Sequence, residues 1–106
     1  MKKLSVTVSH SPKHQQEAKL ATSAILESIE DTIQAHAYGY KAKPILGEAA
    51  EVGRVYTFHS DLSREEMQTI SDEAFEGLGD NDRFEIITLF GSTNEEAFFS
   101  YMLSPR

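Results

Sequence analysis

The sequence predicts an α+β domain in which two amphipathic helices alternate with four strands. Leu4, Val6 and Val8 alternate with polar residues, which is the period of a half-buried strand. Apolar residues then recur every three to four positions in two long segments, at about 13–30 and 63–77, as in amphipathic helices. Two segments rich in β-branched and aromatic residues follow these helices and predict further strands.

The first predicted helix begins after Ser11-Pro12, because Ser is a preferred N-cap and Pro suits the first helical position. Its end has two readings. Residues 32–40 alternate small or apolar residues with His36, Tyr38 and Tyr40, and this favours a second strand. The competing reading extends the helix to residue 36.

Residues 41–53 contain Pro44 and two glycines, and they are expected to form a long loop. The segment 54–59 is predicted to be the third strand because it is β-branched and aromatic.

The second predicted helix has the clearest start signal. Ser63 and Glu66 have the spacing of a capping box, and Leu62 and Met67 have the spacing of a hydrophobic staple. Gly77 or Gly79 is expected to end this helix in a left-handed conformation.

Residues 84–90 have apolar side chains on both faces of a strand, so they are predicted to form a central strand covered on both faces. Thr93 and Glu96 repeat the capping-box spacing, and this predicts a short C-terminal helix over 94–103. The resulting order is β-α-β-β-α-β plus a terminal helix, in one domain over residues 1–106. Two split β-α-β units of this kind predict a ferredoxin-like sandwich, with a four-stranded antiparallel sheet and both helices on one face.

Charge is unevenly distributed along the 106 residues. Residues 1–53 carry six Lys and six acids, whereas residues 54–106 carry four Arg and eleven acids, which accounts for the net charge of −7. Such a surface repels phosphate backbones and favours cationic partners, so nucleic-acid binding is not expected.

No cofactor is expected. The chain has no Cys, and its two neighbouring histidines, His10 and His14, are too few for a zinc site. Neither a signal peptide nor a membrane span is predicted, because no long apolar run follows Met1 or occurs elsewhere. We therefore expect a cytoplasmic protein.

The leading functional hypothesis is a small non-enzymatic protein that binds a basic protein partner, as an inhibitor or immunity-type factor would. The helix dipole explains acids in a first turn but disfavours acids at a C-terminus. Acids near the end of the second helix therefore predict a partner-binding surface made of Asp72, Glu73, Glu76, Asp80 and Asp82.

Two alternatives remain. The first is a dimeric ferredoxin-like domain that binds or transforms a small molecule, in a pocket between the sheet face and the 41–53 loop. Its polar lining would be His36, Tyr38, Tyr40, Tyr56 and His59. The second is a homo-oligomeric structural module that self-associates through the aromatic residues near its C-terminus.

Overall fold

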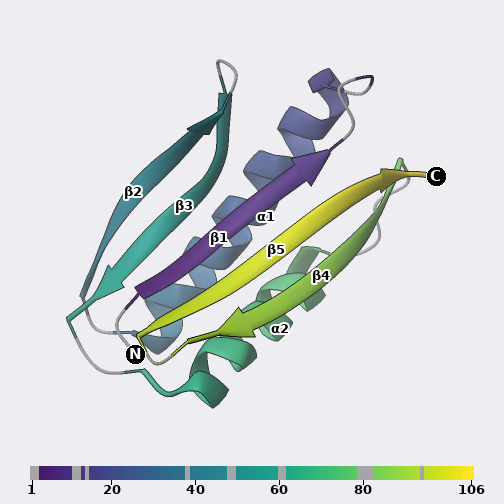
Figure 1. Ribbon diagram of the computed structural model, residues 1–106. Helices are drawn as coiled ribbons and strands as arrows, with labels where there is room; N and C mark the ends of the chain where they lie inside the picture. The colour runs from purple at the N-terminus through teal and green to yellow at the C-terminus, as the bar shows by residue number, and fades with distance from the viewer. Residues whose placement is uncertain are drawn as a thin grey trace.

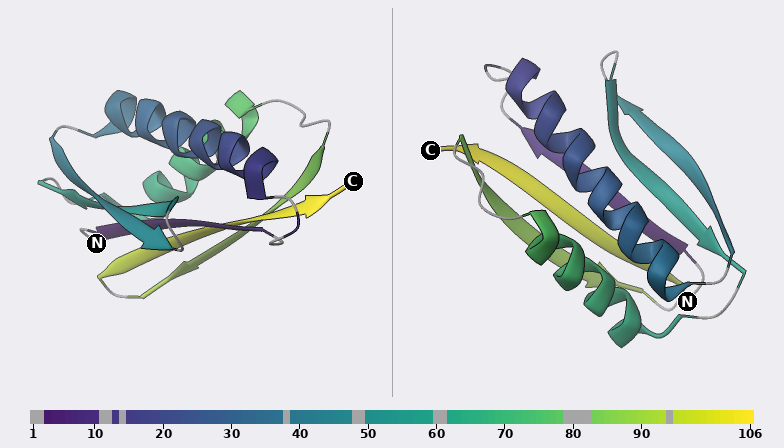
Figure 2. Two further views of the ribbon diagram at one scale, coloured as in Figure 1. Left: turned by 90° about the horizontal axis from the view of Figure 1, so that it is seen from above. Right: turned by 180° about the vertical axis from the view of Figure 1, so that it is seen from behind.

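The computed structural model contains two helices packed on one face of a five-stranded mixed sheet, which confirms the α+β class (Figures 1 and 2). It describes residues 3–10, 13, 15–37, 39–47, 50–59, 62–78, 83–93 and 95–106. The elements in chain order are β1 (Lys3–His10), α1 (Gln15–His36), β2 (Tyr40–Gly47), β3 (Ala50–Phe58), α2 (Arg64–Leu78), β4 (Phe84–Ser92) and β5 (Glu96–Pro105).

The strand order across the sheet is β2-β3-β1-β5-β4. β1 and β5 are parallel, and the other neighbouring strands are antiparallel. The predicted four-stranded antiparallel sheet is therefore wrong, because β5 lies between β1 and β4. The two split β-α-β units are nevertheless present, and two strands rather than one separate β3 from β4.

The segment 32–40 is helical to His36, so the predicted strand there is wrong and the competing reading is right. Ile33 is fully buried and continues the apolar stripe of Ile25 and Ile29 by one more turn. Gly39 follows with a φ of 81°, a left-handed conformation that suits glycine and lets the chain turn into β2.

The predicted 41–53 loop is a β-hairpin made of most of β2 and the start of β3. Pro44 is compatible with a strand here because β2 is at an edge of the sheet. Gly53 has a packing role, since a Cβ at this position would overlap the backbone carbonyl oxygen of Val6 on β1.

The predicted C-terminal helix is wrong as well, because its segment forms β5. Four alternate side chains of β5 are buried: Ala97, Phe99, Tyr101 and Leu103. The Glu96 backbone N–H does donate to Thr93 Oγ1 at 3.3 Å, but the bond closes the connection between β4 and β5. β4, which was predicted to be central, is an edge strand.

The core lies between the sheet and the two helices. β1 contributes Leu4, Val6 and Val8, as its alternation predicts. The predicted cap of α2 is confirmed: the Glu66 N–H donates to Ser63 Oγ at 3.1 Å, and the Ser63 N–H donates to Glu66 Oε1 at 3.3 Å. The staple residues Leu62 and Met67 are both buried.

Candidate functional site

The two helices carry the whole net charge of the protein. Together their sequences contain nine acids against Lys19 and Arg64, a difference of −7, which equals the net charge of the complete chain. Both helices cover the same face of the sheet (Figure 2). The helix layer of the protein is therefore acidic. The strands and connections together have a net charge of zero.

Three of the five acids predicted to bind a partner lie exposed on the C-terminal half of α2. The Glu73 Oε2 is 2.7 Å from Nε2 of His36, at the end of α1. Asp72 Oδ1 accepts a hydrogen bond from Gln68 Nε2 at 3.2 Å. Asp80 and Asp82 lie outside the described residues.

Helix α1 adds acids that the sequence analysis missed. Glu27 and Asp31 are exposed and one turn apart. Residues 1–53 have no net charge in sequence, and this balance concealed the acids of α1. Three of the balancing lysines, Lys3, Lys41 and Lys43, are in strands rather than on the helix. Their spacing of four residues on a predicted helix was the available signal. We define the acidic surface as Glu27, Asp31, Asp72, Glu73 and Glu76.

The three strand lysines belong to the opposite face of the sheet. Lys3 and Lys41 are both register partners of Thr57, and Lys43 lies two residues along β2 from Lys41. Side chains two apart on a strand share a face. We call the side of the sheet opposite the helices the open face, and these lysines form a basic corner on it.

The predicted pocket residues do not lie together on the open face. Tyr56 is completely buried, and its ring packs against the Tyr40 ring with a centroid distance of 5.7 Å. His36 points to α2, where it contacts Glu73. His59 is exposed after β3, and its backbone N–H donates to the Gly39 carbonyl oxygen at 3.3 Å. Tyr38 lies outside the described residues.

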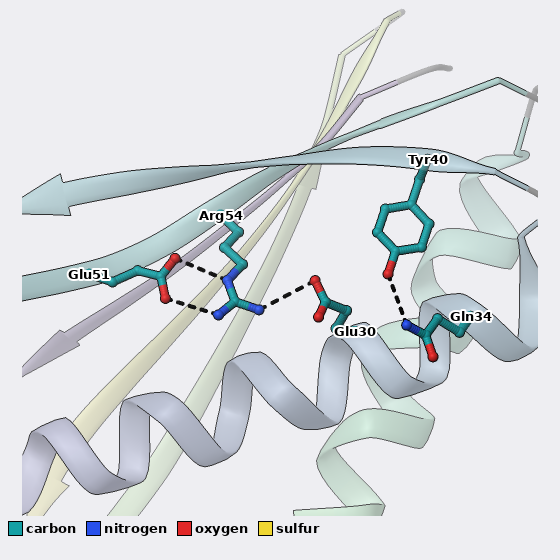
Figure 3. Close-up of polar contacts among 5 residues, drawn as sticks. All are labelled: Glu30, Gln34, Tyr40, Glu51 and Arg54. Atoms are coloured by element: carbon teal, nitrogen blue, oxygen red, sulfur yellow. Dashed lines mark hydrogen bonds and ion pairs between the residues drawn. The ribbon is translucent and has the colours of Figure 1, made fainter.

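A polar cluster connects the β2–β3 hairpin to α1 (Figure 3). Arg54 on β3 donates to both carboxylate oxygens of Glu51 at 3.0 Å and lies 3.3 Å from Glu30 Oε1 on α1. Gln34 Nε2 donates to the Tyr40 hydroxyl at 3.2 Å. Hydrogen bonding to Glu51 raises the pKa of Arg54 further above its ordinary range. The cluster neutralises Arg54, so this residue adds no free cation for an anionic ligand.

The hydroxyl of Tyr56 lies in the same region and makes no hydrogen bond within the described part of the chain. Burial raises its pKa to about 12, and the nearby Arg54 guanidinium opposes this shift. The hydroxyl of Tyr101, by contrast, is 3.1 Å from Ser71 Oγ in the core. Burial also raises the pKa of Tyr101 to about 12.

Among the described residues, no group of three or more His, Cys, Asp or Glu side chains could hold a metal ion. His10 ends β1 with its Nδ1 buried and without a partner in that part of the chain, and His14 lies outside it. No helix within the described ranges is long and apolar enough to cross a membrane.

Comparisons with protein-family models, curated proteins and solved structures found no match for this chain.

Proposed function

We propose that this protein acts by binding another protein and that its acidic surface contacts a basic site on the partner. The observation that carries the proposal is the concentration of the entire net charge of −7 on two helices that share one side of the molecule. A one-sided field of this kind steers a cationic partner toward a defined surface and accelerates association.

Local stability does not explain the acids on the last turns of α2. The first turn contains Glu65 and Glu66, which the helix dipole favours, but the last turn contains no basic residue. Glu76 therefore lies where the dipole disfavours a negative charge. An inhibitor or immunity-type factor that occupies a basic site would need such a surface for its partner.

The small-molecule alternative has less support. Two of its intended lining residues, Tyr40 and Tyr56, pack against each other between the sheet and α1. The loop intended as one wall of the pocket is a regular hairpin.

The test begins with recovery of the partner from the native host and continues with association kinetics on the purified pair. The variant with Asp72→Asn, Glu73→Gln and Glu76→Gln removes three charges from the acidic surface. We expect its association rate constant to fall about tenfold at low salt, and the wild-type rate to fall as salt screens the field.

The matched control is the variant with Glu85→Gln, Glu95→Gln and Glu96→Gln, which has the same net charge but leaves the helices unchanged. We expect it to associate at nearly the wild-type rate. Equal slowing of both variants would mean that only net charge matters. An association rate insensitive to 0.5 M salt would contradict the proposal.

A further inference from the structure

The edge strand β4 has apolar side chains on both of its faces. Ile86 and Phe90 are partly buried on the side of the helices, while Ile87 is 43% exposed and Leu89 59% exposed on the open face. Such a strand is typical of a position covered on both sides. In this chain, however, β4 has a neighbour on one side only.

Most of the exposed apolar surface lies around this edge. Of the seven large apolar side chains that are exposed in the described part of the chain, five are on β4 or on elements beside it. These five are Phe75, Ile87, Leu89, Phe98 and Met102. On the open face, Met102 is the register partner of Ile87, so the two side chains are neighbours.

The flank of α2 that faces β4 carries Arg64, Gln68 and Phe75, with Asp72 hydrogen-bonded to Gln68 at its border. The Arg64 guanidinium lies 5.6 Å from the centre of the Phe90 ring on β4. Gln68 and Phe75 follow Arg64 by four and eleven residues, so they lie along the same flank. Glu73 instead faces α1, where it contacts His36. Glu73 is therefore directed away from the β4 edge, whereas Asp72 follows Gln68 by four residues and accepts a hydrogen bond from it.

The two edges of the sheet differ in their protection. β2 carries Pro44, which cannot donate a backbone hydrogen bond, together with Lys41 and Lys43. β4 has no proline or lysine, and Glu85 is its single charged residue. An unprotected apolar edge of this kind is a template for pairing with another strand.

We propose that β4 pairs antiparallel with β4 of a second copy, across a twofold axis at Thr88, and joins two five-stranded sheets into one. Ile86 of one copy then lies opposite Phe90 of the other, and Ile87 lies opposite Leu89. Glu85 lies opposite Gly91, so no like charges meet across the seam. The sequence Glu85–Gly91 is thus self-complementary around Thr88. For this reason we infer that the strand pairing with β4 comes from a second copy of the chain.

The β4 edge offers a long strand for pairing. A strand of nine residues is about 30 Å long. In the dimer both α2 helices lie on the same side of the joined sheet. The dimer would therefore present two acidic surfaces on one side, which goes beyond the proposed function.

The first test is the mass of the wild-type protein in solution over a concentration series, measured by sedimentation. We expect twice the chain mass of 11.9 kDa. The variant Leu89→Lys should self-associate at least tenfold more weakly, because it places a charge in the apolar seam. The matched control Leu46→Lys changes an even more exposed leucine at the opposite edge and should remain dimeric.

A second test examines the register. The chain has no Cys, so Thr88→Cys introduces a single thiol at the twofold axis. Residues directly opposite in an antiparallel pair have Cα atoms about 4.5–5.5 Å apart, within the range of a disulfide. We expect a covalent dimer on oxidation of this variant and none for Ser100→Cys, which is on the open face of β5.

A wild-type protein that remains monomeric at about 100 μM would overturn the inference. So would a dimer that Leu89→Lys leaves intact but Ser100→Lys disrupts, because that pattern indicates stacking of two open faces. Failure of the partner-binding proposal would change neither result, since the acidic surface is unaltered in these variants.

Discussion

At the scale of single residues, two buried tyrosines differ in one hydrogen bond. Tyr56 and Tyr101 are among the largest fully buried side chains, and both point from the sheet toward the helices. The hydroxyl of Tyr101 pairs with Ser71, whereas that of Tyr56 has no partner in the described part of the chain. A buried polar atom without a hydrogen bond costs about 1–3 kcal/mol.

We therefore predict opposite effects of the same substitution at these two positions. Tyr56→Phe should raise the free energy of unfolding by about 1 kcal/mol, because it removes an unpaired buried hydroxyl. Tyr101→Phe should lower it by about 1–2 kcal/mol, because Ser71 loses its partner inside the core. Urea unfolding of both variants measures the difference. A loss of stability in Tyr56→Phe as large as in Tyr101→Phe would show that a water or an uncharacterised contact satisfies Tyr56.

At the scale of elements, α2 has an N-terminus that favours its acids and a C-terminus that does not. The capping box and first-turn acids stabilise its start. No basic side chain compensates the partial negative charge at its end. The sequence of this helix is thus optimised for stability at one end only.

Charge reversal at the two ends of α2 should have opposite effects. Glu76→Lys should raise the free energy of unfolding by about 0.3–1 kcal/mol, whereas Glu65→Lys should lower it by a similar amount. The two variants have the same net charge, so each is the control for the other. Thermal unfolding at low salt measures the difference, which should shrink at 1 M salt. Equal shifts at both positions would indicate an effect of net charge rather than of the helix dipole.

At the scale of the whole molecule, charge is separated between layers. The helices carry the net charge of −7, and the open face of the sheet carries a basic corner and an apolar edge. Under the two proposals above, the acidic surface contacts a partner and the β4 edge pairs with a second copy. Each proposal is tested by substitutions that leave the other surface unchanged.

The buried tyrosines also set an upper pH limit for the whole fold. Their pKa values are raised from 10.0 to about 12, so the folded state disfavours tyrosinate more than the unfolded state does. Their contribution to stability is complete below pH 10 and is lost as the pH rises from 10 to 12. We predict a fall in the free energy of unfolding as the pH rises from 10 to about 12.

The double variant Tyr56→Phe, Tyr101→Phe should lose much less stability across this pH interval than the wild type. Other groups also titrate there, but they are present in both proteins, so the difference isolates the two tyrosines. Parallel curves for the two proteins would mean that neither phenol resists ionisation in the folded state.

Sequence alone determined the elements whose signals are local. The start of α2 follows from Ser63 and Glu66, because a capping box needs only residues of one turn. The buried face of β1 follows from its period of two, and that of α1 from its period of 3.6. The concentration of acids on α2 was also visible, although the acids of α1 were concealed by lysines that belong to strands.

Only the tertiary structure decided the remaining elements. Residues 94–103 contain apolar side chains that satisfy a helical or a strand period, and β5 forms because β1 and β4 offer hydrogen-bonding neighbours on both sides. The hairpin at 40–58 likewise depends on pairing with β1, which the local Pro and Gly pattern does not reveal. The apolar residues of β4 indicated a covered strand. The physical reason for its exposed position is that strand order is set by non-local pairing, which leaves β4 at an edge of this chain.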